Sequence, residues 1–201
     1  MSPTPEKPLP ARSPTTSNCN VGEFSREERS TLLALAHKSI EAALENREIP
    51  LDAPTPHFEE PRGVFTTLYR RGQLRGCVGY VLPVTSVYRT VAETARAAAF
   101  EDTRFHPVTP EEAPELEVHL SVLSPLRPIA PAQVEVGRHG LLVSMGARRG
   151  LLLPQVPVEY GWDRNTFLEQ TCRKAGLPLD SWQHGATLEA FTAEVFGDNE
   201  T

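Results

Sequence analysis

The alternation of hydrophobic and polar positions along the chain predicts separate helices and strands. After Ser25, leucine, isoleucine and alanine recur three or four positions apart, which is the spacing of one face of an amphipathic helix of about 22 residues. Ser25 followed three positions later by Glu28 is a capping-box signature for the start of that helix. An alanine-rich stretch predicts a second helix over residues 86–100. A third is predicted to begin at Asp163 and to end near Gly176.

A period of two predicts strands elsewhere in the chain. Residues 63–70 and 73–81 flank Arg71-Gly72 and are predicted to form a hairpin with glycine in its turn. The strands predicted after it are ELEVHLSVL, the two halves of GLLVSMGARRGLLLP around a Gly-Ala-Arg-Arg-Gly turn, and LEAFTAEVF. Hairpins with helices between them, rather than strict strand and helix alternation, predict an α+β architecture on a mainly antiparallel sheet.

Proline is concentrated at the beginning of the chain. Five of the 19 prolines occur within the first 14 residues, interleaved with serine and threonine. Such a segment cannot bury enough apolar surface to offset its ordering entropy, so residues 1–20 are predicted to be a disordered tail. Residues 21–201 are predicted to form a single domain, since the 201-residue chain has ordinary globular composition, with 39% hydrophobic and 23% charged residues.

Charge and cysteine content exclude several classes of protein. Twenty Lys and Arg residues against 26 Asp and Glu residues give a net charge of −6, the wrong sign for general binding to nucleic-acid phosphates. No apolar stretch reaches the roughly 20 residues that a membrane-spanning helix needs, and no secretory signal is present. Cys19, Cys77 and Cys172 form no C-x-x-C pair, so no disulfide framework is expected. We therefore expect a cytoplasmic protein that binds neither membranes nor nucleic acid in general.

The segment LRGCVG is the sharpest candidate for chemistry. Strand alternation predicts that Leu74, Val78 and Tyr80 face the core, while Arg75 and Cys77 share the other face. A cation beside the thiol favours the reactive thiolate. Gly76 and Gly79 remove bulk, so that a ligand or another backbone can lie close to the strand. The alternative is that Cys77 is a small buried hydrophobic residue.

Further candidates lie in loops and on a later strand. Asp102 and Arg104 either present an acid and a cation to a ligand or form a pair that ties down their loop. Gln155 and Glu159 follow a predicted strand and either contact a polar ligand or satisfy backbone groups. His119, on the polar face of its strand, is either a base or a solvated polar residue.

Signatures of common cofactors are absent from the sequence. The six histidines show no H-x-H or H-x-x-x-H spacing, so no metal site is predicted. The segments GCVG and GARRG lack the Lys-Ser/Thr of a P-loop, and no G-x-S-x-G nucleophile elbow occurs. The cofactor is therefore unknown at this stage.

LRGCVG is similar to LRGCIG, the signature of the AMMECR domain family, whose prokaryotic members are called AmmeMemoRadiSam system protein A. Further blocks follow in the family's order over about residues 24–197: GVFTTLYRRGQLRGCVGY, AAFEDTRFHPV, LSVLSP, GLLVSMGARRGLLLPQV, EYGW and FLEQTCRKAGLP. The resemblance implies an α+β fold of two unequal parts with a cleft between them. The family has no established activity, but its three-part name implies association with a Memo-like protein and with a radical SAM enzyme.

These observations predict a ligand-binding cleft around the LRGCVG strand, with thiol chemistry at Cys77. The ligand-binding residues expected there are Arg75, Gly76, Gly79, Asp102, Arg104, Gln155 and Glu159. The ligand expected there is a small molecule. The alternative function is a non-catalytic adaptor or regulatory binding module, and the sequence does not decide whether the protein is an enzyme.

Overall fold

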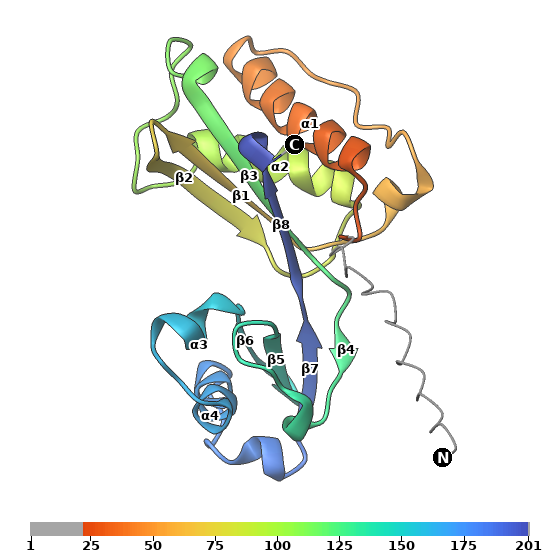
Figure 1. Cartoon of the computed structure of the whole chain (residues 1–201), viewed down its shortest axis with the longest axis vertical. Helices are drawn as coiled ribbons and strands as arrows, with labels where there is room; N and C mark the ends of the chain where they lie inside the picture. The colour runs from red at the N-terminus through yellow and green to blue at the C-terminus, as the bar shows by residue number, and fades with distance from the viewer. Residues whose placement is uncertain (1–21, 201) are drawn as a thin grey trace, which may run out of the picture.

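The computed structural model describes residues 22–200, which form two lobes with a four-stranded antiparallel sheet in each (Figure 1). The strands of the large lobe, in their order across the sheet, are β2 (Gln73–Tyr80), β1 (Val64–Arg70), β3 (Leu116–Leu123) and β8 (Ala193–Gly197). Those of the small lobe are β4 (Arg127–Pro128), β7 (Thr187–Phe191), β5 (Gly140–Met145) and β6 (Arg148–Leu152). The predicted α+β class is confirmed. The tail predicted over residues 1–20, with Cys19, lies outside the described residues.

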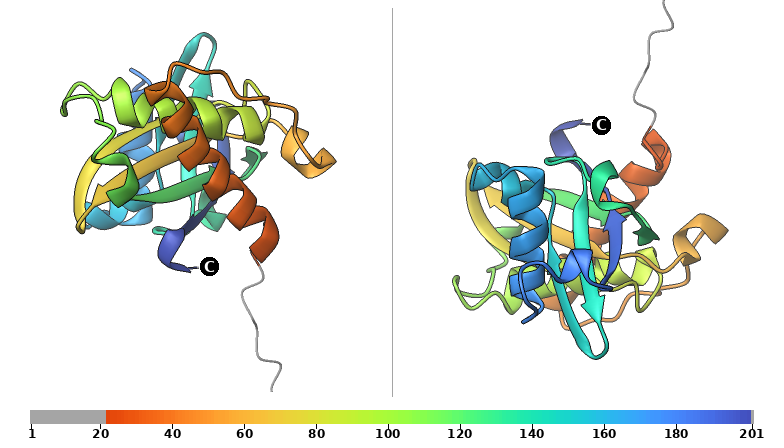
Figure 2. Two further views of the ribbon diagram at one scale, coloured as in Figure 1. Left: turned by 90° about the horizontal axis from the view of Figure 1, so that it is seen from above. Right: turned by 90° about the horizontal axis from the view of Figure 1, so that it is seen from below.

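Two helices cover one face of the large sheet, α1 (Arg26–Leu44) and α2 (Val87–Phe100) (Figure 2). The predicted capping box is present, because Ser25 Oγ accepts from the Glu28 N–H and the Glu28 carboxylate accepts from the Ser25 N–H. Helix α1 is 19 residues long, slightly shorter than predicted. Small residues let α2 lie close to β2: a side chain at Gly76 would overlap the carbonyl of Ala98.

The β1–β2 hairpin turns at Arg71 and Gly72, as predicted. Both residues have positive φ angles, 53° and 73°, which suit a two-residue hairpin turn of the primed type. Val78 packs against the core of the large lobe, as the alternation predicted. Tyr80 was predicted on the core face, but it is 45% exposed because β2 ends there.

A β-bulge interrupts this hairpin inside the LRGCVG segment. Leu68 pairs with Gly76 while its neighbour Tyr69 pairs with Leu74, so Arg75 has no partner on β1. The extra residue shifts the alternation and places Leu74 beside Tyr69, where Leu74 is 41% exposed. The prediction that Leu74 faces the core was therefore wrong.

The small lobe packs one helix against its sheet. Its helices are α3 (Gln155–Glu159) and α4 (Arg164–Lys174), and α4 lies against β5 and β6. The predicted ends of α4 are confirmed, because Asp163 accepts from the Thr166 N–H over 2.8 Å and Gly176 follows with φ 69°. The turn between β5 and β6 is shorter than predicted, since both arginines of the GARRG segment belong to β6.

Two strand segments connect the lobes. The predicted strand LEAFTAEVF is divided, with its first half in β7 of the small sheet and its second half in β8 of the large sheet (Figure 1). Beside it, the Ser124 N–H donates to the Thr192 carbonyl over 2.8 Å, and the Thr192 N–H donates to Ser124 Oγ over 3.0 Å. A groove of about 450 Å³ at this junction is lined by residues of both lobes, such as Glu23 and Arg138.

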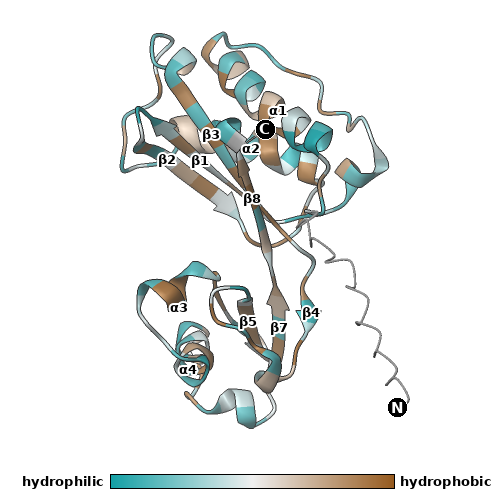
Figure 3. Cartoon of the chain, in the orientation of Figure 1, coloured by the Kyte–Doolittle hydropathy of each residue, from teal (hydrophilic) through white to brown (hydrophobic). Residues whose placement is uncertain are grey.

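Each lobe has a hydrophobic core of its own, centred on residues such as Val64 and Leu68 in the large lobe and Val143 and Phe167 in the small lobe. Hydrophobic and hydrophilic residues alternate along the strands and helices of both lobes (Figure 3). Within residues 22–200, no helix combines the length and the apolar character needed to cross a membrane. The cytoplasmic location stays a prediction.

Candidate functional site

Cys77 lies in the middle of β2, at the edge of the large sheet, where its outward backbone groups have no strand partner. Asp102 and Arg104 take the place of that partner. The Cys77 N–H donates to Asp102 Oδ2 over 2.8 Å, and Arg104 Nη2 donates to the Cys77 carbonyl over 3.4 Å. The Asp102 and Arg104 side chains thus bind the two backbone groups of one strand residue. These contacts match the second interpretation of the pair, in which it ties down its own loop.

The Asp102–Arg104 pair is itself closely joined. Arg104 Nε donates to Asp102 Oδ1 over 2.9 Å and Arg104 Nη2 to Oδ2 over 2.7 Å, while the Asp102 side chain is only 6% exposed. The Arg104 guanidinium therefore holds the pKa of Asp102 well below its ordinary range, helped by the backbone N–H of Cys77. The loop after α2 is fixed to the sheet edge by a carboxylate that remains ionised.

The Cys77 thiol lies on the open face of the sheet and is half-buried. Its Sγ is 3.3 Å from Thr67 Oγ1 on β1. Arg75 does not lie beside it, because the bulge directs that guanidinium to Glu112 Oε2 and to the His106 carbonyl, each over 2.9 Å. The prediction that Arg75 accompanies the thiol was wrong, and the guanidinium that contacts Cys77 is that of Arg104, which lies at the backbone carbonyl and not at Sγ.

At both glycines of the motif, other protein atoms occupy the position that a side chain would need. At Gly76 an added side chain would meet the backbone of Ala98, and at Gly79 it would meet the ring of Phe65. Another backbone therefore lies against Gly76, which is the second of the two readings of this residue. Gly76 leaves no open space for the expected ligand, whereas Gly79 lines a cavity of about 600 Å³ at the end of β2, together with residues such as Tyr80 and Leu82.

The other expected site residues lie apart from this strand. Gln155 and Glu159 are exposed on α3 of the small lobe, and neither side chain forms a hydrogen bond within the described residues. His119 shares the open face of the large sheet, where register places it opposite Thr67, which in turn lies opposite Cys77. Its ring meets the edge of Tyr69 at 5.1 Å. The structure thus aligns Cys77, Thr67 and His119 across three strands but brings no side chain of α3 to them.

An open cleft of about 700 Å³ lies beside the bulge, and we call it the guanidinium cleft. Its lining residues are Arg70, Arg75, Thr103, Arg104, Phe105, His106, Pro107, Thr109, Glu111 and Glu112. Two of the expected ligand-binding residues, Arg75 and Arg104, meet here. Both guanidiniums lie over the ring of Phe105, with centroid distances of 6.0 Å and 5.5 Å.

Each arginine of the cleft is anchored by a carboxylate on one side. Arg70 donates to Glu112 over 2.7 Å from Nη1, and Arg75 donates to the same carboxylate over 2.9 Å from Nη2. Arg75 lowers the pKa of Glu112, so the anchor stays ionised. Arg70 Nη2, Arg75 Nη1 and Arg104 Nη1 donate to no acceptor within residues 22–200, and Arg75 Nη1 is buried.

Sequence reasoning missed Arg70, His106 and Glu112 as neighbours of Arg75. Arg70 comes from β1, and His106 and Glu112 come from the connection between α2 and β3; the unpaired position of Arg75 in the bulge brings its side chain to them. A charged residue within a strand next to glycine is a weak sequence signal for such a bulge. The long-range pairing that selects it is not visible in the sequence.

The fold and the site define a class: a two-lobed α+β domain whose LRGCVG edge strand is clamped by an Asp-x-Arg loop. A model of the AMMECR1 family matches residues 33–196. The chain belongs to the AMMECR1 family.

Relatives and a solved structure agree with this assignment. A protein of Thermococcus gammatolerans is 47% identical over 180 residues, which cover 82% of this chain and 87% of the relative. One of Methanothermobacter thermautotrophicus is 43% identical and covers 88% of this chain and 97% of its own length. The crystal structure of an uncharacterized protein from Pyrococcus horikoshii is 41% identical, with a TM-score of 0.67 over 85% of this chain and 91% of that one.

Proposed function

We propose that the protein binds a small anionic molecule, carrying a carboxylate or phosphate group, in the guanidinium cleft. The observation that carries this proposal is Arg75 Nη1, a buried donor that has no acceptor within the described residues and belongs to a residue that lines the cleft. A buried donor without a partner is costly, and an anion in the cleft supplies the missing acceptor.

The anchoring of the arginines supports an anionic ligand. Their carboxylate partners hold the guanidiniums in place, so little side-chain entropy remains to be lost on binding. The three arginines are paired with carboxylates, Asp102 and Glu115 among them, so the attraction for an anion comes from the free guanidinium N–H groups and not from a net positive charge. Free amino groups of neighbouring guanidiniums suit the oxygens of a carboxylate or a phosphate.

The LRGCVG segment has a clear part in this proposal. The bulge turns Arg75 toward the cleft, and Gly76 lets α2 lie against the strand. The clamp of Cys77 by Asp102 and Arg104 fixes the neighbouring wall. The motif therefore positions two guanidiniums, and its cysteine is one of the points at which the strand is held.

Titration calorimetry with inorganic phosphate and with malonate tests this function. We expect Arg75→Met and Arg104→Met to weaken the binding of whichever anion binds by about tenfold, which is the loss of one charge-assisted contact. Arg89→Met is the matched control, because Arg89 is an exposed arginine on α2 outside the cleft. If neither anion binds, or if Arg89→Met weakens binding as much as the other two, the cleft is not an anion site.

Thiol chemistry at Cys77 is a second candidate function. It is supported by the half-buried thiol on the open face of the sheet and by the Thr67 hydroxyl beside Sγ. Its test is the reactivity of Cys77, which is compared with that of a buried cysteine in the Discussion.

An adaptor role is supported by a different surface. At the end of β2 and directly after it, Tyr80, Leu82 and Val84 are 45%, 48% and 85% exposed. A run of exposed apolar side chains suits a partner protein. We propose a Memo-like protein and a radical SAM enzyme as partners, on the basis of the sequence resemblance alone. Co-purification of each with the full chain, compared with Leu82→Ser, tests this assignment, and equal recovery with both chains would contradict it.

A further inference from the structure

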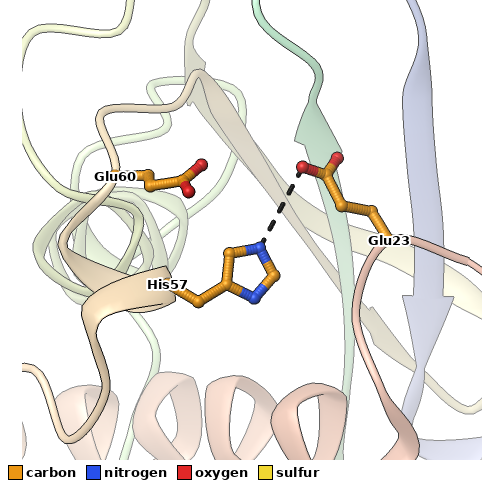
Figure 4. Close-up of side chains that lie close together, drawn as sticks. All are labelled: Glu23, His57 and Glu60. Atoms are coloured by element: carbon orange, nitrogen blue, oxygen red, sulfur yellow. Dashed lines mark ion pairs between the residues drawn. The ribbon is translucent and has the colours of Figure 1, made fainter.

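Three ionisable side chains converge beside the N-terminus of α1. One of them is far from the other two in the sequence, so no sequence motif indicates that they meet. They are Glu23, His57 and Glu60, and one donor atom of each lies within 4.8 Å of the others (Figure 4). His57 belongs to the short helix Pro56–Glu59, and His57 Nε2 is 4.0 Å from Glu23 Oε1. The three side chains are 25% to 50% exposed, so solvent reaches them.

The orientation of the His57 ring is set from outside this trio. Its Nδ1 is 2.7 Å from Glu28 Oε1, and its ring stacks on Phe24 at 4.5 Å with an interplanar angle of 10°. A carboxylate only accepts, so Nδ1 carries a proton toward Glu28, and Nε2 is the ring nitrogen that faces Glu23. Nε2 and Glu23 Oε1 are 4.0 Å apart, which is too far for a hydrogen bond but close enough for one metal ion to bind both.

The charges around His57 also favour a divalent cation. Glu23, Glu28 and Glu60 carry three negative charges, and Arg62, which pairs with Glu23 and Glu60, carries one positive charge. These four side chains together carry two negative charges. Arg62 contacts both oxygens of Glu23 but one oxygen of Glu60, so a metal ion would share Glu23 Oε1 with Arg62 or displace it, and it would find one oxygen of Glu60 free of Arg62.

We propose that Glu23, His57 and Glu60 bind a divalent metal ion of the zinc class. Imidazole and carboxylate ligands suit Zn²⁺ at roughly 2.0–2.2 Å, so two ligand atoms 4.0 Å apart can share one ion. Glu28 is then the outer carboxylate that fixes the tautomer of a metal-bound histidine. Three protein ligands leave a coordination position for water.

A protonated His57 is the competing occupant of this space. It would satisfy Glu23 and Glu28 without a metal ion. The metal proposal requires instead that a divalent ion binds at neutral pH to the full chain and raises its melting temperature.

The test is zinc titration of the chelator-treated full chain by calorimetry and by thermal unfolding. We expect the chain to bind zinc at one site. The zinc affinity should fall at least tenfold in His57→Ala and in Glu60→Gln, and about 10- to 100-fold in Glu28→Gln. His37→Gln is the matched control. His37 forms a similar pair with Asp198, at 2.9 Å, away from the trio, and we expect unchanged affinity.

Cobalt absorption separates this site from adventitious binding to cysteine. We expect the spectrum of Co²⁺ bound by nitrogen and oxygen, without the near-ultraviolet charge-transfer band of a thiolate ligand. The proposal is overturned if the full chain binds no zinc at millimolar concentration, if Glu60→Gln and His57→Ala bind like the unchanged chain, or if the thiolate band appears. Glu60→Gln changes a half-exposed side chain, so its folding is expected to survive.

Discussion

The two lobes pack a strand against a helix in the same way. In the large lobe Gly76 of β2 lies against the backbone of Ala98 at the end of α2, and in the small lobe Gly150 of β6 lies against the backbone of Ala175 at the end of α4. A side chain at either position would overlap backbone atoms that cannot move aside easily. Because the device occurs in both lobes and only the large lobe carries the guanidinium cleft, we assign Gly76 to packing rather than to ligand contact.

The lobes differ in how they use charge. Among the described residues, the ion pairs of the small lobe join near neighbours in sequence, Glu135 with Arg138 and Asp180 with His184. The large lobe has near-neighbour pairs too, such as Asp102 with Arg104, but it also has pairs that join distant segments, as Arg75 does with Glu112. A pair between near neighbours costs little to form and affects tertiary structure only where it contacts another segment, as Asp102 and Arg104 do at Cys77. Both kinds of pair build the cleft.

The largest expected effect comes from the shared packing device. Gly76→Val and Gly150→Val should each lower the free energy of unfolding by about 3 kcal/mol, because overpacking against backbone is relieved only by moving the helix. Both tryptophans, Trp162 and Trp182, belong to the small lobe. Tryptophan fluorescence during denaturant unfolding therefore follows that lobe, while circular dichroism follows the helices of both.

These two variants also test whether the lobes unfold separately. Since the cores are separate, we expect Gly76→Val to move the circular dichroism transition more than the fluorescence transition, and Gly150→Val to do the reverse. Equal shifts of both signals would show that the two connecting strands couple the lobes into one cooperative unit. A stable Gly76→Val chain would contradict the packing assignment itself.

A smaller effect is expected at the clamp of the edge strand. Asp102→Asn should lower the free energy of unfolding by about 1.5–2 kcal/mol at neutral pH, since it removes a charged acceptor from Arg104 and Cys77. Because the pKa of Asp102 lies below its ordinary value of 3.8, its contribution is complete above about pH 4 and declines as pH falls further.

The pH dependence gives the control for this variant. Chemical unfolding at pH 7 and at pH 3 should show that the difference between the two chains is smaller at pH 3. A difference that stays constant over this range would mean that the ionised carboxylate is not what holds the loop.

The reactivity of cysteine sharpens the contrast between the lobes further. Cys77 should alkylate faster at pH 7 than Cys172, which is fully buried in the small lobe, where burial raises the pKa of its thiol. Arg104→Met should slow Cys77 by about threefold, because the Arg104 charge acts on the thiol from its position at the Cys77 carbonyl, and Arg75→Met should have little effect. Mass spectrometry of labelled peptides measures both rates. A stronger effect of Arg75→Met than of Arg104→Met would show that Arg75 is the cation that activates Cys77, as the sequence predicted.

The smallest effect is expected at the N-terminus. A chain that starts at Gly22 should melt within about 1 °C of the full chain, because a segment rich in proline and serine has no apolar face to bury. A chain that starts at Ser25 is the comparison. It lacks Phe24, which is 2% exposed, and Glu23, so it should melt several degrees lower. Equal melting of the two truncated chains would contradict the packing of Phe24.

The sequence by itself determined the features that depend on neighbouring residues. The capping box at Ser25, the turn at Arg71-Gly72 and the cap at Asp163 are all present where the pattern predicted them. Each rests on side-chain or backbone preferences that act within a few positions. The family signature and the α+β class were also readable, because they depend on local motifs and on the order of elements.

Only the tertiary structure decided which distant residues and strands become neighbours. The bulge at Arg75 comes from the register between β1 and β2, and it moved that guanidinium away from Cys77 and toward Glu112. The final predicted strand was divided between two sheets because its halves pair with different partners. Alternation along one strand carries no information about its partner, and a one-residue shift in pairing reverses every face that follows. The guanidinium cleft and the neighbours of His57 therefore became visible only once distant segments were placed together.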